Sequence, residues 1–115
     1  MTESRLKQAY AEGRRALGQG DSARALAAFG QALAIDPEDP LSLQGAGIAL
    51  MRLGRVRDAE ALLRRALDAA KRLYGSQHPT VAAIEPHLAE SARKLDRTGD
   101  TPFPRGRDET PGARA

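Results

Sequence analysis

The sequence predicts an all-α fold in which five antiparallel helices stack into an α-α superhelix, and three observations lead to this prediction. The composition is rich in alanine, leucine and arginine, which favour helices, and poor in β-branched residues. Apolar residues recur at spacings of three and four along most of the chain, whereas no stretch alternates with the period of two expected of a strand. The pattern of small and large residues also repeats along the chain, which is typical of a helical repeat.

The clearest helix lies between Gly20 and Pro37. Gly20 can adopt the positive φ that a tight turn between helices requires, and Asp21 is placed to accept a backbone N–H at the start of the next helix. The apolar residues that follow share one helix face: Ala25, Leu26, Phe29, Ala32 and Leu33. Because the residue before Pro37 is pushed out of the α region, the helix should span about residues 22–35.

Side-chain size recurs with a period of 34 residues. Adding 34 to positions in the first helix pair matches glycine with glycine, alanine with alanine, and a large apolar residue with another. The matched pairs are Gly13 and Gly47, Gly20 and Gly54, Ala25 and Ala59, Phe29 and Leu63, Ala32 and Ala66, and Leu33 and Leu67. We therefore predict two repeats, at about residues 6–39 and 40–73.

These residues resemble the tetratricopeptide repeat, whose period is also 34 residues. The second helix of that repeat carries a glycine and an acid, then two Ala–Leu pairs around an aromatic residue, and an Asp-Pro exit. Here those residues are Gly20, Asp21, Ala25–Leu26, Phe29, Ala32–Leu33 and Asp36–Pro37. The small alanines should lie where the two helices of a repeat approach closely, with Phe29 filling the space beside them.

The other helices are predicted from their boundary residues. We expect the first at about residues 2–17, the third at about residues 40–53, and the fourth from about residue 56 to Gly75. No Asp-Pro follows Leu67, so the fourth helix should be nearly two turns longer than the second. The segment LYGSQHPTVAAIEPHLAE that follows resembles the longer, 42-residue repeat of kinesin light-chain-like tetratricopeptide proteins.

A fifth helix at about residues 79–95 should close the stack as a capping helix, completing two and a half repeats. Its predicted apolar stripe is Val81, Ile84, Leu88, Ala92 and Leu95. Pro86 lies inside this helix and should either kink it or delay its start. The repeat domain would then span residues 1–96. Residues 97–115 are predicted as a disordered tail, with a docking motif around Phe103 as the alternative.

The composition argues against several functional classes. With no cysteine, the chain forms no disulfide or thiolate metal site. No apolar run approaches the roughly 18 residues of a membrane span, and no signal peptide is visible at the start, which together predict a cytoplasmic protein. The 18 basic and 15 acidic residues give a net charge of only +3, so weak nucleic-acid binding is the least favoured hypothesis.

No catalytic, cofactor or metal site is predicted, and we expect no enzyme. Residues 18–23 fit the dinucleotide fingerprint G-x-G-x-x-A, but that motif requires a preceding strand. The two histidines lack an acidic third ligand beside both. His78 is placed to cap the fifth helix, and His87 should face solvent or a groove.

The family resemblance implies a concave groove lined by the first helices of successive repeats. The groove positions in this sequence are Lys7, Tyr10, Arg14, Gln44, Ile48, Arg52, Glu90 and Arg93. They are more basic than acidic, so an acidic peptide would be favoured. The carboxylate clamp of chaperone-binding members is not reproduced, because Tyr10, Arg14 and Gly45 occupy its positions.

The leading hypothesis for function is therefore a protein–protein interaction module that binds a peptide or partner protein in this groove. The alternative is a structural role, in which a homo-oligomer or a larger assembly forms through an apolar end helix.

Overall fold

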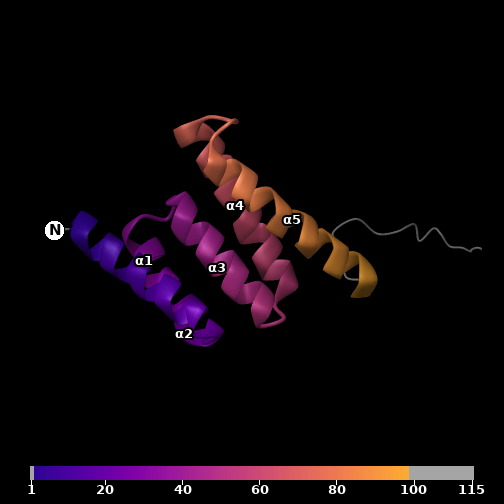
Figure 1. Cartoon of the computed structure of the whole chain (residues 1–115), viewed down its shortest axis with the longest axis horizontal. Coiled ribbons are helices and arrows are strands. Elements are labelled where there is room, and N and C mark those ends of the chain that lie inside the picture. The colour runs from indigo at the N-terminus through magenta and orange to yellow at the C-terminus, as the bar shows by residue number, and fades with distance from the viewer. Residues whose placement is uncertain (1, 99–115) are drawn as a thin grey trace, which may run out of the picture.

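The computed structural model describes residues 2–98, which form five helices joined by short turns (Figure 1). The helices are α1 (Thr2–Gly18), α2 (Ser22–Ile35), α3 (Pro40–Arg52), α4 (Val56–Tyr74) and α5 (Pro79–Thr98). No strand occurs within this range, and every predicted helix end lies within three residues of the observed one. The all-α prediction is confirmed.

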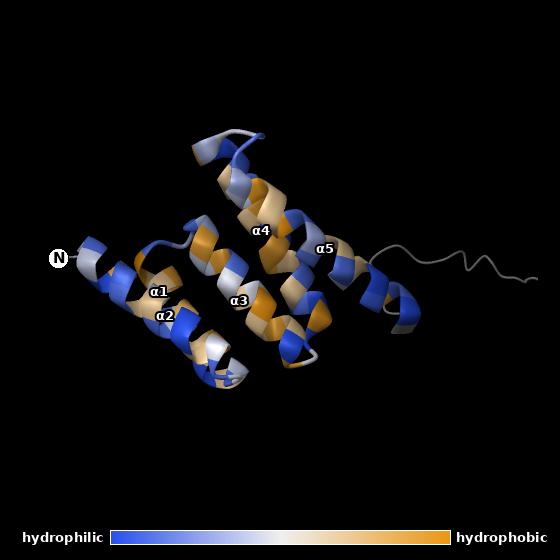
Figure 2. Ribbon diagram, viewed as in Figure 1, coloured by the Kyte–Doolittle hydropathy of each residue, from blue (hydrophilic) through white to orange (hydrophobic). Residues whose placement is uncertain are grey.

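The helices pack in sequence order, and α3 lies in the middle of the stack (Figure 1). Each helix contacts the next, and α3 also approaches α1 and α5, whereas α2 and α4 do not approach each other. The stack therefore curves, with α1, α3 and α5 on its inner side. Figure 2 shows that α3 and α4 carry many of the hydrophobic residues, while the C-terminal end of α5 is hydrophilic.

Two equivalent turns join the two helices of each predicted repeat. Gly20 and Gly54 adopt φ values of 78° and 83°, in the left-handed region that favours glycine. After α1, the Asp21 N–H donates to the Ala16 carbonyl at 2.9 Å, and after α3 the Arg55 N–H donates in the same way to the carbonyl five residues earlier. This bond defines a Schellman motif, which satisfies carbonyls at the helix end. The predicted match between the two turns is confirmed.

The Phe29 side chain of α2 lies fully buried between two glycines. A Cβ atom added to Gly13 of α1 would lie 2.6 Å from the Phe29 ring, and one added to Gly45 of α3 would lie closer still. In the second repeat, a Cβ on Gly47 would lie 2.7 Å from Leu63. The same glycine-to-large-residue contact therefore recurs in both repeats.

The alanines of the repeat signature are confirmed as close-contact positions. Those of α2 and α4, at positions 25, 32, 59 and 66, are all completely inaccessible to solvent. A second buried cluster, around Leu43 and Leu63, joins α3, α4 and α5 through Val81 and Ile84. Leu33 and Leu62 pack against both this cluster and the one around Phe29, so the core extends along the stack and includes α5.

Helix α5 begins at Pro79 and continues through Pro86, so the predicted delayed start is wrong. Proline removes one helical hydrogen bond, to the carbonyl of the residue four positions earlier. That residue, Ala82, and Pro86 itself are both exposed, so the carbonyl lies on the solvent side. The helix extends to Thr98, into the predicted tail, and residues 99–115, with the candidate motif at Phe103, lie outside the described range.

One member of the predicted apolar stripe of α5 is wrong. Ala92 is exposed, and the neighbouring Ser91 is fully buried in its place. The Ser91 hydroxyl donates to the Leu88 carbonyl at 2.7 Å, which satisfies its donor inside the core. The buried face of α5 is therefore rotated by one residue at this point.

The acidic loop of residues 36–39, between α2 and α3, holds α3 and α4 together. Asp39 caps α3 by accepting the Ser42 backbone N–H at 3.1 Å. Arg65 donates to the Pro37 carbonyl at 3.0 Å, and Glu38 pairs with Arg65 at 3.4 Å and with Arg72 at 3.1 Å. Two arginines of α4 thus hold the loop that starts α3.

We expect Glu38→Gln to lower the free energy of unfolding by about 0.5–1 kcal/mol, because exposed ion pairs contribute little individually and Glu38 makes two. The loss should shrink in high salt, which screens exposed charges. Urea denaturation at low and high salt measures it. Glu85→Gln is the matched control, since no ion pair is found between Glu85 and another described residue; equal losses in both variants would contradict the role of the loop.

Candidate functional site

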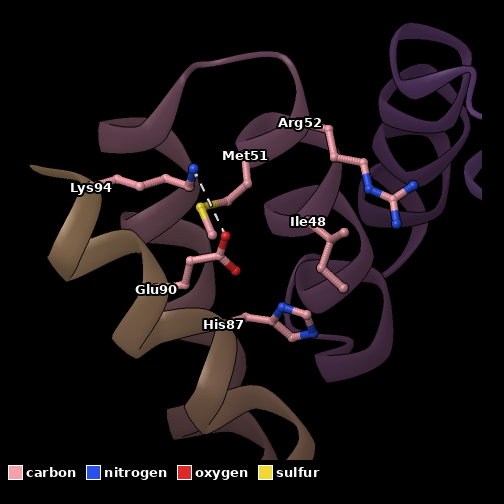
Figure 3. Close-up of a pocket in the computed structure, with 6 residues that line it drawn as sticks. All are labelled: Ile48, Met51, Arg52, His87, Glu90 and Lys94. Carbon is pink, nitrogen blue, oxygen red and sulfur yellow. Dashed lines mark ion pairs between the residues drawn. The ribbon is translucent and has the colours of Figure 1, made fainter.

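Two adjoining hollows lie on the inner side of the stack. The α1–α3 hollow, of about 320 Å³, is lined by Tyr10, Arg14, Leu17, Leu41, Gln44, Gly45 and Ile48. The α3–α5 hollow, of about 380 Å³, is lined by Ile48, Met51, Arg52, His87, Glu90 and Lys94 (Figure 3). Because Ile48 lines both hollows, they form one continuous groove along α1, α3 and α5.

Helix periodicity explains why α3 presents these residues to the groove. Positions three, four and seven apart share one face of an α-helix. Leu41, Gln44 and Ile48 follow that spacing and are half-buried, whereas Leu43 and Leu50 point into the core. Helix α3 therefore supplies the floor of the groove with one face and part of the core with the other.

The α1–α3 hollow has an ordered aromatic wall. The Tyr10 ring lies 5.8 Å from the Phe29 ring, so the wall rests directly on the core. The Arg14 guanidinium donates to the Tyr10 hydroxyl at 3.1 Å and lies 5.8 Å from the centre of its ring. These contacts favour one orientation of Tyr10 and place a cation at the edge of an otherwise largely apolar hollow.

The α3–α5 hollow is more highly charged. Lys94 and Glu90, one turn apart on α5, lie 3.9 Å from each other. Figure 3 shows Arg52 pointing away from this pair, toward α1, where its guanidinium donates to the Leu17 carbonyl at 3.1 Å. His87 projects from α5 toward Ile48. The lining thus contains two permanent cations, one anion and one imidazole.

The structure brings six of the eight predicted groove residues together. The six that line a hollow are Tyr10, Arg14, Gln44, Ile48, Arg52 and Glu90. Lys7 and Arg93 are exposed and line neither hollow. The predicted groove positions did not include Leu17, Leu41, Gly45, Met51 and Lys94, and His87 was expected to face either solvent or a groove. Helix spacing could have found His87 and Lys94, because they lie three residues before and four residues after Glu90.

A second aromatic contact lies outside the groove, where α4 ends. Tyr74 stacks on His78 with ring centres 4.5 Å apart, and the His78 Nδ1 accepts the Thr80 backbone N–H at 3.1 Å. The predicted capping role of His78 is therefore confirmed. The pKa of the Tyr74 hydroxyl is raised above 10.0, mainly by burial and to a lesser extent by the negative charge of Asp39.

The described residues show two further features that bear on function. No group of three or more histidine or acidic side chains within residues 2–98 lies close enough to hold a metal ion. Over the same range, none of the helices combines the length and the apolar character that crossing a bilayer requires.

Paired helices that stack in register and leave a groove along every first helix define a helical-repeat protein. A family model described as tetratricopeptide repeat matches residues 16–76, more than half of the chain. The chain belongs to the tetratricopeptide repeat family. Repeats of this family generally mediate protein–protein interaction and are typically not catalytic. No match to the chain was found among curated proteins or among solved structures.

Proposed function

We propose that the groove along α1, α3 and α5 binds a peptide segment of a partner protein. The observation that carries this proposal is the pair of adjoining hollows with apolar side chains in the floor and polar groups at the rim. Ligand sites commonly combine an apolar lining with a few convergent polar groups. Leu41, Ile48 and Met51 are only half-buried, so they can bury further apolar area against a partner.

Charge favours an acidic partner segment. The groove lining carries the cations Arg14, Arg52 and Lys94 against a single anion, Glu90. Guanidinium and ammonium groups form charge-assisted hydrogen bonds with carboxylates. The same field attracts an acidic segment during encounter and repels a basic one.

Assembly through an apolar end of the stack is less well supported. The hollow on the outer side of α1 and α2 is lined by Arg5, Gln8, Ala9, Glu12, Gln31, Ala34 and Ile35, most of which are polar or small. At the other end, the C-terminal part of α5 is hydrophilic (Figure 2). Within residues 2–98 the exposed large apolar side chains are Leu53, Leu73 and Tyr74. Association by hydrophobic burial requires a larger contiguous apolar patch.

Nucleic-acid binding is also disfavoured by the pairing of basic residues on α4. Arg64 pairs with Glu60 at 2.6 Å, and Glu38 pairs with both Arg65 and Arg72. A nucleic-acid surface instead needs a cluster of cations directed at phosphates.

Selection from a random peptide library displayed on phage tests the proposal. Enriched peptides should bind the wild-type chain, and Ile48→Lys should weaken them at least about tenfold, because a cation replaces the apolar floor shared by both hollows. Ala61→Lys, an exposed site on α4, is the matched control and should bind as the wild type does. Circular dichroism checks that both variants fold. Failure to enrich any peptide, or equal binding by Ile48→Lys, would contradict the proposal.

A further inference from the structure

We infer that His87 makes the groove bind acidic peptide segments more tightly as the pH falls. This inference rests on the proposed function, since it concerns the same groove. His87 and His78 are the only histidines of the chain, and they occupy different environments. His87 lines the α3–α5 hollow, whereas His78 lies at the start of α5 with its Nδ1 already accepting a hydrogen bond.

The other charged groups of the α3–α5 hollow already have partners. Lys94 lies 3.9 Å from Glu90, and Arg52 donates to the Leu17 carbonyl. No hydrogen bond or ion pair joins His87 to another of residues 2–98, and its half-buried ring projects toward Ile48 (Figure 3). A proton on this imidazole would therefore add a cation with a free donor inside the hollow.

The charge balance of the hollow gives the direction of the effect. Arg52 faces it from α3, Glu90 and Lys94 face it from α5, and no described residue of α4 lines it. With neutral His87 the lining carries one net positive charge, and with protonated His87 it carries two. A carboxylate bound in the hollow stabilises the imidazolium, so protonation and acidic-peptide binding favour each other.

The chemistry of the groups sets the pH range of the effect. An imidazole changes charge between about pH 8 and pH 5, whereas Asp and Glu carboxylates stay largely ionised above about pH 5. Affinity should therefore rise as the pH falls across this interval. Below it, affinity should fall again because the peptide carboxylates become protonated. One added ion pair in an open groove corresponds to about a fivefold change in affinity.

Isothermal titration of an acidic peptide enriched on the wild-type chain tests the inference. Between about pH 8 and pH 5 the dissociation constant should fall about fivefold, and titrations in buffers of different ionisation enthalpy should show proton uptake on binding. His87→Gln should lose both the pH dependence and the proton uptake, whatever its affinity at the higher pH. His78→Gln, which lies outside the groove, should retain both.

The outcomes separate this inference from the proposed function. A library that yields only non-acidic peptides, or a pH dependence that persists in His87→Gln, would overturn the role of His87 and leave peptide binding intact. If His78→Gln rather than His87→Gln loses the pH dependence, the titrating group lies at the end of α4, and the inference is overturned. A library that yields no peptide would overturn both proposals.

Discussion

The Phe29→Ala variant is expected to lose about 3–5 kcal/mol of unfolding free energy, the usual cost of truncating a buried phenylalanine. The Phe29 side chain is fully buried, and the other buried members of its cluster are all alanines. Tyr10 and four leucines pack against this cluster but are only partly buried: Leu17, Leu26, Leu33 and Leu62. Alanine side chains are too short to close the cavity that the missing ring would leave. A single domain has only about 5–15 kcal/mol of stability, so the variant should lose a large share of it.

Chemical denaturation followed by circular dichroism measures this loss. Leu73→Ala is the control, because Leu73 is a large apolar residue that is 61% exposed, and its truncation should change stability by less than about 0.5 kcal/mol. Similar losses in the two variants would show that the Phe29 ring does not join α1, α2 and α3.

The Gly45→Ala variant is expected to be less stable than the wild type by about 1–3 kcal/mol, although alanine is the better helix former. A Cβ at this position of α3 would overlap the Phe29 ring, and the ring cannot retreat because Gly13 of α1 lies against it on another side. Either α3 moves away from α2 or the ring leaves its place. Both changes would also disturb Tyr10, which rests on Phe29.

Gly30→Ala is the matched control for this variant. Gly30 is an exposed glycine within α2, and a Cβ there would meet no atom within 4 Å. The same substitution should therefore stabilise the chain by about 0.5–1 kcal/mol through helix propensity alone. Thermal or chemical unfolding of the two variants gives effects of opposite sign if the packing is as described. A stabilised Gly45→Ala would show that α2 and α3 do not approach closely at this point.

The helix boundaries could be predicted because their causes are local. The residues 22–35 predicted for α2 are those observed, since Asp21 caps its start and the residue before Pro37 ends it. Gly20 and Gly54 likewise end the first helix of each repeat through their own backbone conformation. These signals act within a few residues, so the helix ends can be predicted from the sequence.

Features that depend on neighbouring helices were harder to predict. Ala92 and Ser91 are adjacent on α5, and the apolar pattern alone assigned burial to the wrong one. Helix α5 packs against α3 and α4 but has no following helix within the described residues, so its faces differ from those of α1 and α3.

The groove shows the same division between local and long-range causes. The repeat register places residues such as Gln44 and Glu90 on the correct helix face, because equivalent positions of each repeat point the same way. The register does not give the depth of the hollows. The prediction therefore included Lys7 and Arg93, which line neither hollow. The contact between Arg52 and the Leu17 carbonyl joins residues 35 positions apart, and no sequence pattern predicts it.

The measurement that tests the groove most directly is a titration of the ¹⁵N-labelled chain with an enriched peptide, followed by amide chemical shifts. Binding in the groove predicts that the largest shift changes fall on residues that line the two hollows, such as Gln44, Ile48 and His87, and that the exposed faces of α2 and α4 stay unchanged. Changes concentrated on α2 and α4, with the groove residues unaffected, would contradict the assignment of this surface to partner binding.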